Sequence, residues 1–238
     1  MNKHFGVNNK VELLGTYGSD QSHALSAWTS TSRDLDKVNK NGKSKRDRIP
    51  SLLKMLAENQ HHTPFEKSSI HFLVTSDIAS HIHILKHRIS VSLNGESARY
   101  KELVEDKLYL PNDWPTEERK KYLKHLEATY KHYHESVDSL TEHYIDIDKL
   151  SKRDARKRAK ESARFYLPYG NQITCDVMFN FRSFYHFLSL RYSVHAQKEI
   201  SDLDKEMLQL VIDTKQFNET LKAFKLVDDK GQMVPPFK

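Results

Sequence analysis

The apolar residues of this chain recur with the two periods that separate strands from helices. Ile70, Phe72 and Val74 alternate with more polar residues, which predicts a strand that turns one face toward a core. A second segment is rich in residues that favour strands, and a third carries Val11, Leu13, Leu14 and Tyr17. The three expected strands cover Lys10 to Gly18, Ser69 to Ser76 and Gln172 to Phe179.

A step of three or four residues between apolar positions predicts helices elsewhere. The longest covers Thr116 to Ile145, where a stripe from Tyr122 to Tyr144 is more typical of a core or a subunit interface than of a ligand site. Asp20 or Ser22 is the expected cap of a short helix. The other helices are expected over Ile49 to Glu58, over Ile78 to Arg88 with Ile82, Leu85 and Ile89 on its apolar side, over Ser151 to Ala163, from Asn180 to about Glu199, and over Ile200 to Leu226.

Length and composition are typical of one folded domain. The 238 residues are 37% hydrophobic and 29% charged, and the chain has no internal repeat. We therefore expect a single domain over residues 1–238, with extended termini at 1–9 and 228–238. No apolar run reaches the roughly 18 residues of a membrane-spanning helix, and the first residues lack the apolar segment of a signal peptide. The expected location is the cytoplasm.

The chain carries a net charge of +6, from 38 Lys and Arg against 32 Asp and Glu. This excess suits anionic ligands, nucleotides included, but is too small to indicate DNA binding by itself. Residues 33–48 and the predicted helix 151–163 concentrate the basic side chains. A nucleic-acid-binding module is one interpretation of these two segments. A solvated surface is the favoured one, because no aromatic side chains are interleaved in the basic helix.

Neither the histidines nor the cysteine indicates a metal centre. His61 and His62 are adjacent, but no third ligand follows at a recognisable spacing, so no metal is expected. Cys175 is the only cysteine, which excludes an internal disulfide. Its apolar surroundings predict a buried, unreactive thiol.

The densest candidate chemistry lies in one short stretch. The basic residues Lys86-His87-Arg88 are followed by the polar run Asn94-Gly95-Glu96-Ser97 and by Arg99-Tyr100. Arginine and lysine favour phosphate groups, and a glycine permits close backbone approach. The functional interpretation is a pocket for a phosphorylated ligand. Composition alone leaves open a solvated basic turn after a helix.

The order of these residues resembles the signature of the flavin-dependent thymidylate synthases, in which Arg-His-Arg is followed by Asn, Ser and Arg-Tyr. Asn94, Ser97 and Arg99-Tyr100 keep the family's mutual spacing. Lys86 stands in place of the first arginine, and one extra residue precedes the asparagine. The next two residues, Gly95 and Glu96, are both candidates for the role of the family's glutamate.

Three further segments are similar to the same family, in the family's order. They are His61-His62-Thr63-Pro64-Phe65-Glu66, then Arg164 with Leu167-Pro168, and finally Asn180-Phe181-Arg182 with Leu190-Arg191 and His195-Ala196-Gln197. Each segment alone is a weak signal. Four segments in the correct order, over most of residues 10–200, make a specific resemblance.

The resemblance implies an α+β fold, with a central twisted antiparallel sheet flanked by long helices. It implies a homotetramer whose active sites draw on several subunits. It also implies the reductive methylation of dUMP to dTMP, with methylenetetrahydrofolate as carbon donor, NADPH as reductant and FAD as hydride carrier. The chain has no glycine-rich dinucleotide motif and no Walker motif, so the flavin site would be of the family's own kind.

Residue roles carry over from the family position by position. Arg191 would be catalytic and face the uracil, because a permanent charge there stabilises the negative charge that gathers on the N3/O4 edge. A structural salt bridge from Arg191 to Glu199 is the alternative. His186 stands where the family commonly has asparagine, and His83 where it often has glutamine. The implied FAD contacts are Ser30, Thr63, Glu66, Lys86, His87, Arg88, Asn180, Arg182, His186 and His195. The implied dUMP contacts are His83, Lys86, Glu96, Ser97, Ala98, Arg99, Arg164 and Arg191.

The helix expected from Asn180 would present polar groups on two sides. At 100° per residue, Asn180, Arg191 and His195 fall within about 60° of one another, whereas Arg182 and His186 point elsewhere. Each side would then serve a different active site across subunits. A nucleotide-binding relative that kept the pocket but lost turnover remains an alternative, because of Lys86 and the shifted glutamate.

Overall fold

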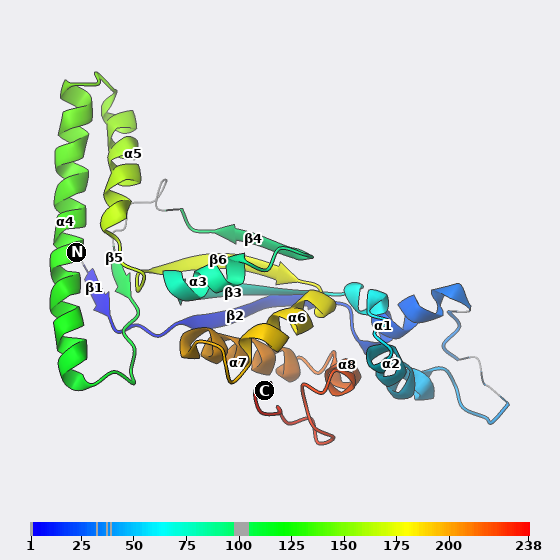
Figure 1. Ribbon diagram of the computed structural model, residues 1–238. Coiled ribbons are helices and arrows are strands. Elements are labelled where there is room, and N and C mark those ends of the chain that lie inside the picture. The colour runs from blue at the N-terminus through cyan, green and yellow to red at the C-terminus, as the bar shows by residue number, and fades with distance from the viewer. Residues whose placement is uncertain (1, 32, 37, 39, 98–104) are drawn as a thin grey trace. The chain divides into compact units, whose positions relative to one another are not determined.

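The computed structural model describes residues 2–31, 33–36, 38, 40–97 and 105–238 (Figure 1). This part of the chain has an α+β fold and forms two compact units, each built from three separate stretches of sequence. Unit 1 comprises residues 1–9, 75–84 and 95–175, and unit 2 comprises residues 10–74, 85–94 and 176–238. No helix in the described ranges is both long and apolar enough to cross a membrane.

Within the described residues, the larger sheet is antiparallel and has four strands in the order β2-β3-β6-β4. The expected strands are confirmed as β2 (Lys10–Tyr17), β3 (Ser69–Asp77) and β6 (Gln172–Phe179). The fourth strand, β4 (Val91–Gly95), was not predicted, because its last residues favour a loop. A strand at the edge of a sheet tolerates such polar residues, since one side of its backbone needs no partner strand.

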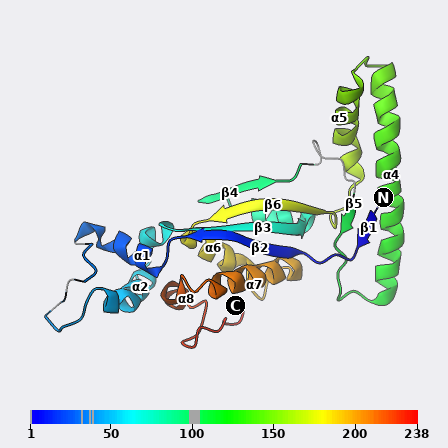
Figure 2. The same ribbon diagram turned by 180° about the vertical axis from the view of Figure 1, so that it is seen from behind.

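Unit 1 has its core where two long helices pack together, α4 (Thr116–Asp146) and α5 (Lys152–Ala163). Figures 1 and 2 show them side by side from opposite directions. The predicted stripe on α4 is confirmed as core, and Tyr130, Tyr133 and Val137 are fully or almost fully buried. Opposite it, α5 contributes small residues that permit close approach of the two backbones. These residues are Ala155, Ala159 and Ala163, all fully buried.

The basic side chains of α5 lie away from this core, and some already have partners. Arg156 pairs with Asp138 of α4 at 2.5 Å, and Arg158 lies 3.6 Å from Glu161. Unit 1 also contains a parallel pair of short strands, β1 (Asn2–Phe5) and β5 (Glu105–Leu108), and the short helix η4 (Arg164–Tyr166), which contacts α4 and α5.

Helix α3 (Ile78–Leu85) is three residues shorter than predicted, and its predicted apolar side is wrong. Leu85 and Ile89 are 45% and 88% exposed, whereas Ser80, His81 and Ile84 are buried. Beyond the helix the chain turns at Ser90, which has a positive φ of 56°, before entering β4.

Unit 2 packs helices around an aromatic core. Phe65, Phe181, Phe184 and Phe217 are fully buried, and α7 packs against β2. The helices are α1 (Asp20–Ala27), η1 (Trp28–Ser30), η2 (Arg46–Arg48), α2 (Ile49–Glu58), η3 (Thr63–Glu66), α6 (Phe181–Arg191), α7 (Lys198–Asp213) and α8 (Asn218–Ala223).

Several predicted boundaries in unit 2 are wrong. The helix that follows Asn180 ends at Arg191. His195 therefore lies in a turn and does not share a helix face with Asn180 and Arg191. The expected helix 200–226 is two helices, because Lys215 adopts a positive φ of 59° between α7 and α8. The N-cap of α1 is Ser19; the carboxylate of Asp20 instead accepts hydrogen bonds from the backbone N–H groups that open α8.

The C-terminal segment is tied to the rest of unit 2, although we expected it to be extended. It forms a turn from Asp228 to Gln232, closed by a backbone hydrogen bond of 2.8 Å. Phe237 then pairs with Ser193 in a parallel bridge. The backbone hydrogen bonds explain the difference, since they occupy groups that an extended tail would leave to water.

Candidate functional site

Two distant segments of unit 2 meet at the ring of His87. Nε of Arg191, at the end of α6, donates a hydrogen bond of 3.3 Å to Nε2 of His87. An arginine is only a donor, so Nε2 of His87 is the acceptor in this hydrogen bond. The ring also lies edge-on to Phe187 at 4.8 Å and 5.8 Å from the ring of His186. The structure therefore brings together three predicted site residues.

A buried carboxylate lies within the electrostatic influence of Arg191. Asp204 of α7 is fully buried, and neither of its oxygens has a hydrogen-bond partner among the described residues. Burial raises the pKa of Asp204 well above its ordinary value, while the charge of Arg191 acts to lower it. Sequence reasoning missed this residue, since a single aspartate within a helix carries no local signal.

The start of α6 is fixed by side-chain hydrogen bonds. Oδ1 of Asn180 accepts from the backbone N–H of Ser183 at 2.8 Å, which makes Asn180 the N-cap of the helix. The hydroxyl of Ser183 donates to the backbone oxygen of Ser90 at 2.9 Å. The turn that carries the predicted basic residues is thereby tied to α6.

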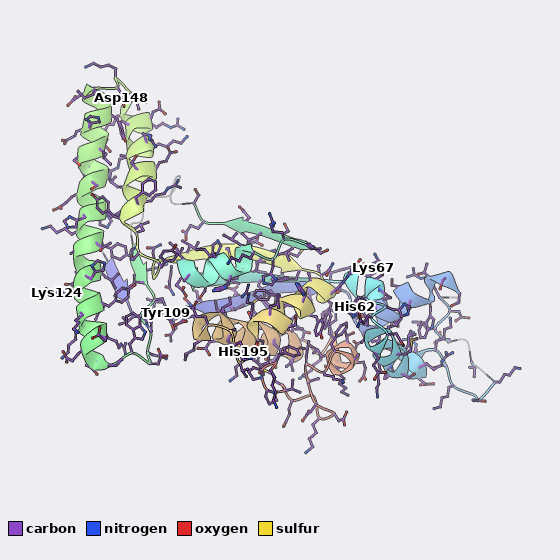
Figure 3. All side chains as sticks on the ribbon, viewed as in Figure 1. His62, Lys67, Tyr109, Lys124, Asp148 and His195 are labelled. Carbon is purple, nitrogen blue, oxygen red and sulfur yellow. The ribbon has the colours of Figure 1, made fainter. Side chains whose placement is uncertain are left out.

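Glu66 and Arg182 are also brought together. They form an ion pair between η3 and the first turn of α6, although 116 residues separate them in sequence. His62, close to Glu66 in the chain, packs against the rings of Tyr185 and Phe224. Figure 3 shows His62 and Lys67 in the region of α1 and α2.

A cavity of about 800 Å³ opens beside this ion pair, within unit 2. Its volume falls within the range of small-molecule sites. Glu66, Arg33 and Lys67 line it together with hydroxyl groups, so it offers cations and donors to an anionic ligand. Arg33 and Lys67 were not predicted as site residues, although Lys67 directly follows a predicted one.

Other predicted residues of unit 2 are exposed and not joined to this cluster. Ser30 and Thr63 are exposed, and the hydroxyl of Ser30 donates to the backbone oxygen of Ala27. Lys86 and Arg88 are exposed on either side of His87. His195 is exposed in the turn between α6 and α7, where Figure 3 labels it.

The remaining predicted residues belong to unit 1. His83 is half-buried on α3, Ser97 is half-buried beyond the end of β4, and Arg164 is exposed at the start of η4. Glu96 forms two hydrogen bonds with Thr174 of β6. The backbone N–H of Glu96 donates to the backbone oxygen of Thr174 at 2.8 Å, and the carboxylate of Glu96 accepts from the backbone N–H of Thr174 at 3.3 Å. The predictions for Ala98 and Arg99, and for Tyr100, fall outside the described residues.

Cys175 is buried on β6, as predicted. The chemistry therefore rests on cationic, imidazole and amide groups that are set in an α+β fold. Such groups bind phosphate and planar polar rings. Together with the fold, they define the class of this protein, which is a binding protein or enzyme for anionic ring compounds.

Comparison with known proteins identifies the family within this class. The chain belongs to the thymidylate synthase complementing protein family, whose profile matches residues 12–214. A flavin-dependent thymidylate synthase of Pseudothermotoga lettingae is 31% identical over 207 residues, covering 84% of this chain and 83% of that protein. The enzyme of the same name from Tropheryma whipplei strain TW08/27 is 33% identical over 192 residues, covering 77% and 76%.

A solved structure agrees with this assignment. A UMP/dUMP methylase, PolB from Streptomyces cacaoi bound with 5-Br dUMP, is similar with a TM-score of 0.72 and 25% sequence identity. The similarity covers 94% of this chain and 97% of that one. The resemblance inferred from four short motifs is thus confirmed at the level of the family.

Proposed function

We propose that this protein is a flavin-dependent thymidylate synthase that converts dUMP to dTMP by reductive methylation. Methylenetetrahydrofolate would donate the carbon and NADPH the electrons. Family membership supports the reaction. The observation that carries the proposal in this chain is the convergence of Arg191 and His87, which are 104 residues apart in sequence.

The described residues of unit 2 fit FAD. The cavity beside Glu66 is of ligand size, and Arg33 and Lys67 offer the cations that a diphosphate group requires. Bound FAD would supply the hydride that reduces the transferred carbon. By resemblance, the residues that would hold it are Ser30, Thr63, Glu66, Lys86, His87, Arg88, Asn180, Arg182, His186 and His195.

For dUMP, we propose phosphate and sugar contacts from residues carried over by resemblance. The proposed dUMP residues include cations and small donors, which are the groups that bind a phosphomonoester. Among them, the side chain of Arg164 is exposed and can pair with a phosphate. The set comprises His83, Lys86, Glu96, Ser97, Ala98, Arg99 and Arg164.

Arg191 would act on the uracil ring. Its Nε is engaged by His87, and no other hydrogen bond of its side chain occurs among the described residues. Its two terminal NH₂ groups therefore remain for a ligand. A guanidinium at the N3/O4 edge of uracil would stabilise negative charge there and make C5 a better nucleophile toward the incoming carbon.

We further propose that the enzyme assembles as a homotetramer with shared active sites. Large apolar residues next to several predicted site residues are exposed in the single chain. Ile89 is 88% exposed beside Arg88, and Phe165 is 88% exposed beside Arg164. Contacts between neighbouring copies would remove these apolar side chains from water, which favours association. The cytoplasmic location stays a prediction.

The deciding experiment is an absorbance spectrum of the purified protein with and without dUMP, followed by an assay for dTMP. We expect a flavin spectrum that dUMP perturbs, and dTMP formation that requires dUMP, methylenetetrahydrofolate and NADPH. A colourless protein that takes up no added FAD would contradict the proposal. Flavin binding without dUMP-dependent oxidation of the reduced flavin would identify the catalytically impaired relative instead.

A further inference from the structure

The C-terminal strap, defined as residues 226–237, is hydrogen-bonded to the chain directly after the last residue of α6. The backbone N–H of Phe237 donates to the oxygen of Tyr192 at 2.9 Å, and the N–H of Val194 donates to the oxygen of Phe237 at 2.9 Å. The hydroxyl of Tyr192, a buried residue, also donates to the backbone oxygen of Val234 at 2.8 Å. These three hydrogen bonds join the strap to the end of α6.

The strap is itself held at its start. Leu226 is fully buried, and its backbone oxygen accepts from the N–H of Val234 at 3.1 Å. Pro235 and Pro236 then lead to Phe237. Proline fixes φ and has no N–H, so this link is stiff, and the N–H groups on either side of it are both hydrogen-bonded. The strap therefore meets α6 as a restrained segment.

Ser193 extends this restraint to the turn that carries His195. Ser193 pairs with Phe237 in the parallel bridge. Its backbone oxygen accepts from the N–H of Ala196 at 3.0 Å, and its hydroxyl accepts from the N–H of His195 at 3.3 Å. The backbone of the turn is thus fixed from Ser193, and Ser193 is fixed by the strap.

The same contacts close the last turn of α6. The N–H of Tyr192 donates to the oxygen of Leu188 at 2.8 Å, and Arg191 lies within this turn. The final carbonyl groups of a helix have no partner inside it, and helix ends open more easily than helix centres. The strap gives Tyr192 two partners from outside the helix, which opposes such opening next to Arg191.

We propose that the C-terminal strap positions the end of α6 and the turn after it, so that Arg191 and His195 keep fixed places for their ligands. The strap acts through these residues, since none of its own is among the predicted ligand contacts. It lies beyond residues 12–214, the part of the chain that matches the family profile. The catalytic consequence rests on the proposed function, whereas the restraint does not, because it concerns hydrogen bonds within unit 2.

The test changes single residues and keeps the full chain. Phe237→Pro removes the N–H that donates to Tyr192. Lys238→Pro is the matched control, because Lys238 is exposed and its N–H makes no backbone hydrogen bond among the described residues. Phe237→Leu keeps the N–H and an apolar side chain, so it should behave like the wild type.

Hydrogen exchange measured by mass spectrometry reports on the turn without any ligand. In Phe237→Pro, we expect the peptide over residues 192–197 to exchange at least about fivefold faster than in the wild type, because a lost hydrogen bond makes local opening easier. The peptide over α2 should be unchanged. Lys238→Pro and Phe237→Leu should match the wild type in both peptides.

The effect on the site is measured as FAD affinity, from flavin fluorescence, and as kcat for dTMP. We expect Phe237→Pro to weaken FAD binding by about threefold or more, since His195 is no longer held, and to lower kcat by about fivefold or more, since Arg191 is misplaced. A strap that only stabilised the fold would lower the urea unfolding midpoint and leave FAD affinity and kcat of the folded protein unchanged.

Tyr192→Phe is the second variant and keeps the test open if Phe237→Pro does not fold. It removes only the hydroxyl that bonds to Val234 and should cause the same changes to a smaller degree. Tyr144→Phe is its control, since it removes a hydroxyl contact of 3.1 Å with Ser162 in unit 1 and should cause none of them.

The outcomes separate the restraint from the reaction. Unchanged exchange over residues 192–197 in both strap variants would overturn the restraint. Faster exchange together with wild-type FAD affinity and kcat would overturn the positioning role. Faster exchange in a protein whose wild type forms no dTMP would uphold the restraint and refute only the proposed reaction.

Discussion

Arg191 has a hydrogen bond to a histidine on one side and a buried carboxylate in its surroundings. The hydrogen bond to His87 restricts the guanidinium, and its terminal NH₂ groups remain for substrate. Preorganised charge of this kind stabilises a transition state without reorganisation during the reaction.

The first prediction concerns that charge. Arg191→Ala should lower dTMP formation by about 10²–10³-fold, equivalent to roughly 3–4 kcal/mol of barrier, while the protein still binds FAD. The measurements are product formation by chromatography and the flavin absorbance of the purified variant. Turnover equal to that of the wild type would remove Arg191 from its catalytic role.

His23 is a residue whose role is structural. Its ring is fully buried, with Nε2 2.9 Å from the hydroxyl of Ser68 and Nδ1 3.0 Å from that of Thr220. Burial disfavours the charged imidazolium and lowers the pKa of His23 to about 4.

This pKa gives the second prediction. The folded state favours the neutral ring of His23, because its pKa is lower there than in the unfolded chain. The corresponding contribution to the unfolding free energy is complete above the unfolded pKa of about 6.5 and is lost as the pH falls toward 4. The contribution of His23 to that loss is about 3 kcal/mol in unfolding free energy. Urea unfolding between pH 7.5 and about 4 measures it.

His23→Gln should flatten this part of the pH profile, whereas His143→Gln, which changes an exposed histidine of α4, should not. Parallel profiles for the wild type and the His23 variant would contradict the assignment of the pH dependence to this ring.

At the scale of elements, helix α6 carries Arg182, His186 and Arg191, and its N-cap determines where the helix begins. Asn180→Ala removes the acceptor for the N–H of Ser183 and should lower the unfolding free energy by about 1 kcal/mol. It should also lower turnover, since Arg182 and His186 follow within the first two turns.

Ser151→Ala is the matched control, because Ser151 caps α5 by accepting from the N–H of Asp154 at 3.2 Å. We expect a similar loss of stability in this variant with turnover unchanged. If both variants lost turnover equally, stability alone would explain the effect of Asn180→Ala. Chemical denaturation and the dTMP assay are the two measurements.

At the scale of the whole molecule, the proposed assembly can be tested through an exposed apolar residue. Ile89→Asp should leave a single chain folded, because the side chain is 88% exposed, but should prevent copies from associating and thereby abolish turnover. Light scattering should give four times the 27.9 kDa of one chain for the wild type and a smaller mass for the variant.

Val38→Asp, at a residue that is 57% exposed in the region 33–48, is the control and should keep the wild-type mass and turnover. An assembly of unaltered mass in Ile89→Asp would exclude this residue from the contact between copies.

Much of the secondary structure and the family could be predicted from local sequence. The limits of α2 and the long stripe of α4 followed from periodicity, because burial of one face leaves a regular trace in the sequence. The errors arose where an isolated backbone conformation ends an element. Lys215, with a positive φ, separates α7 from α8 where the apolar pattern alone would continue one helix.

The sequence by itself determined the positions of β2, β3, β6 and the longer helices, the motifs of the family and the chemical types available to a site. Only the tertiary structure decided which of these side chains meet. Arg191 joins His87, Glu66 joins Arg182, and Asp204 lies buried without a hydrogen-bond partner among the described residues, in the field of Arg191. The physical reason is that periodicity reports burial along one element, whereas a contact across about a hundred residues depends on how separate elements pack.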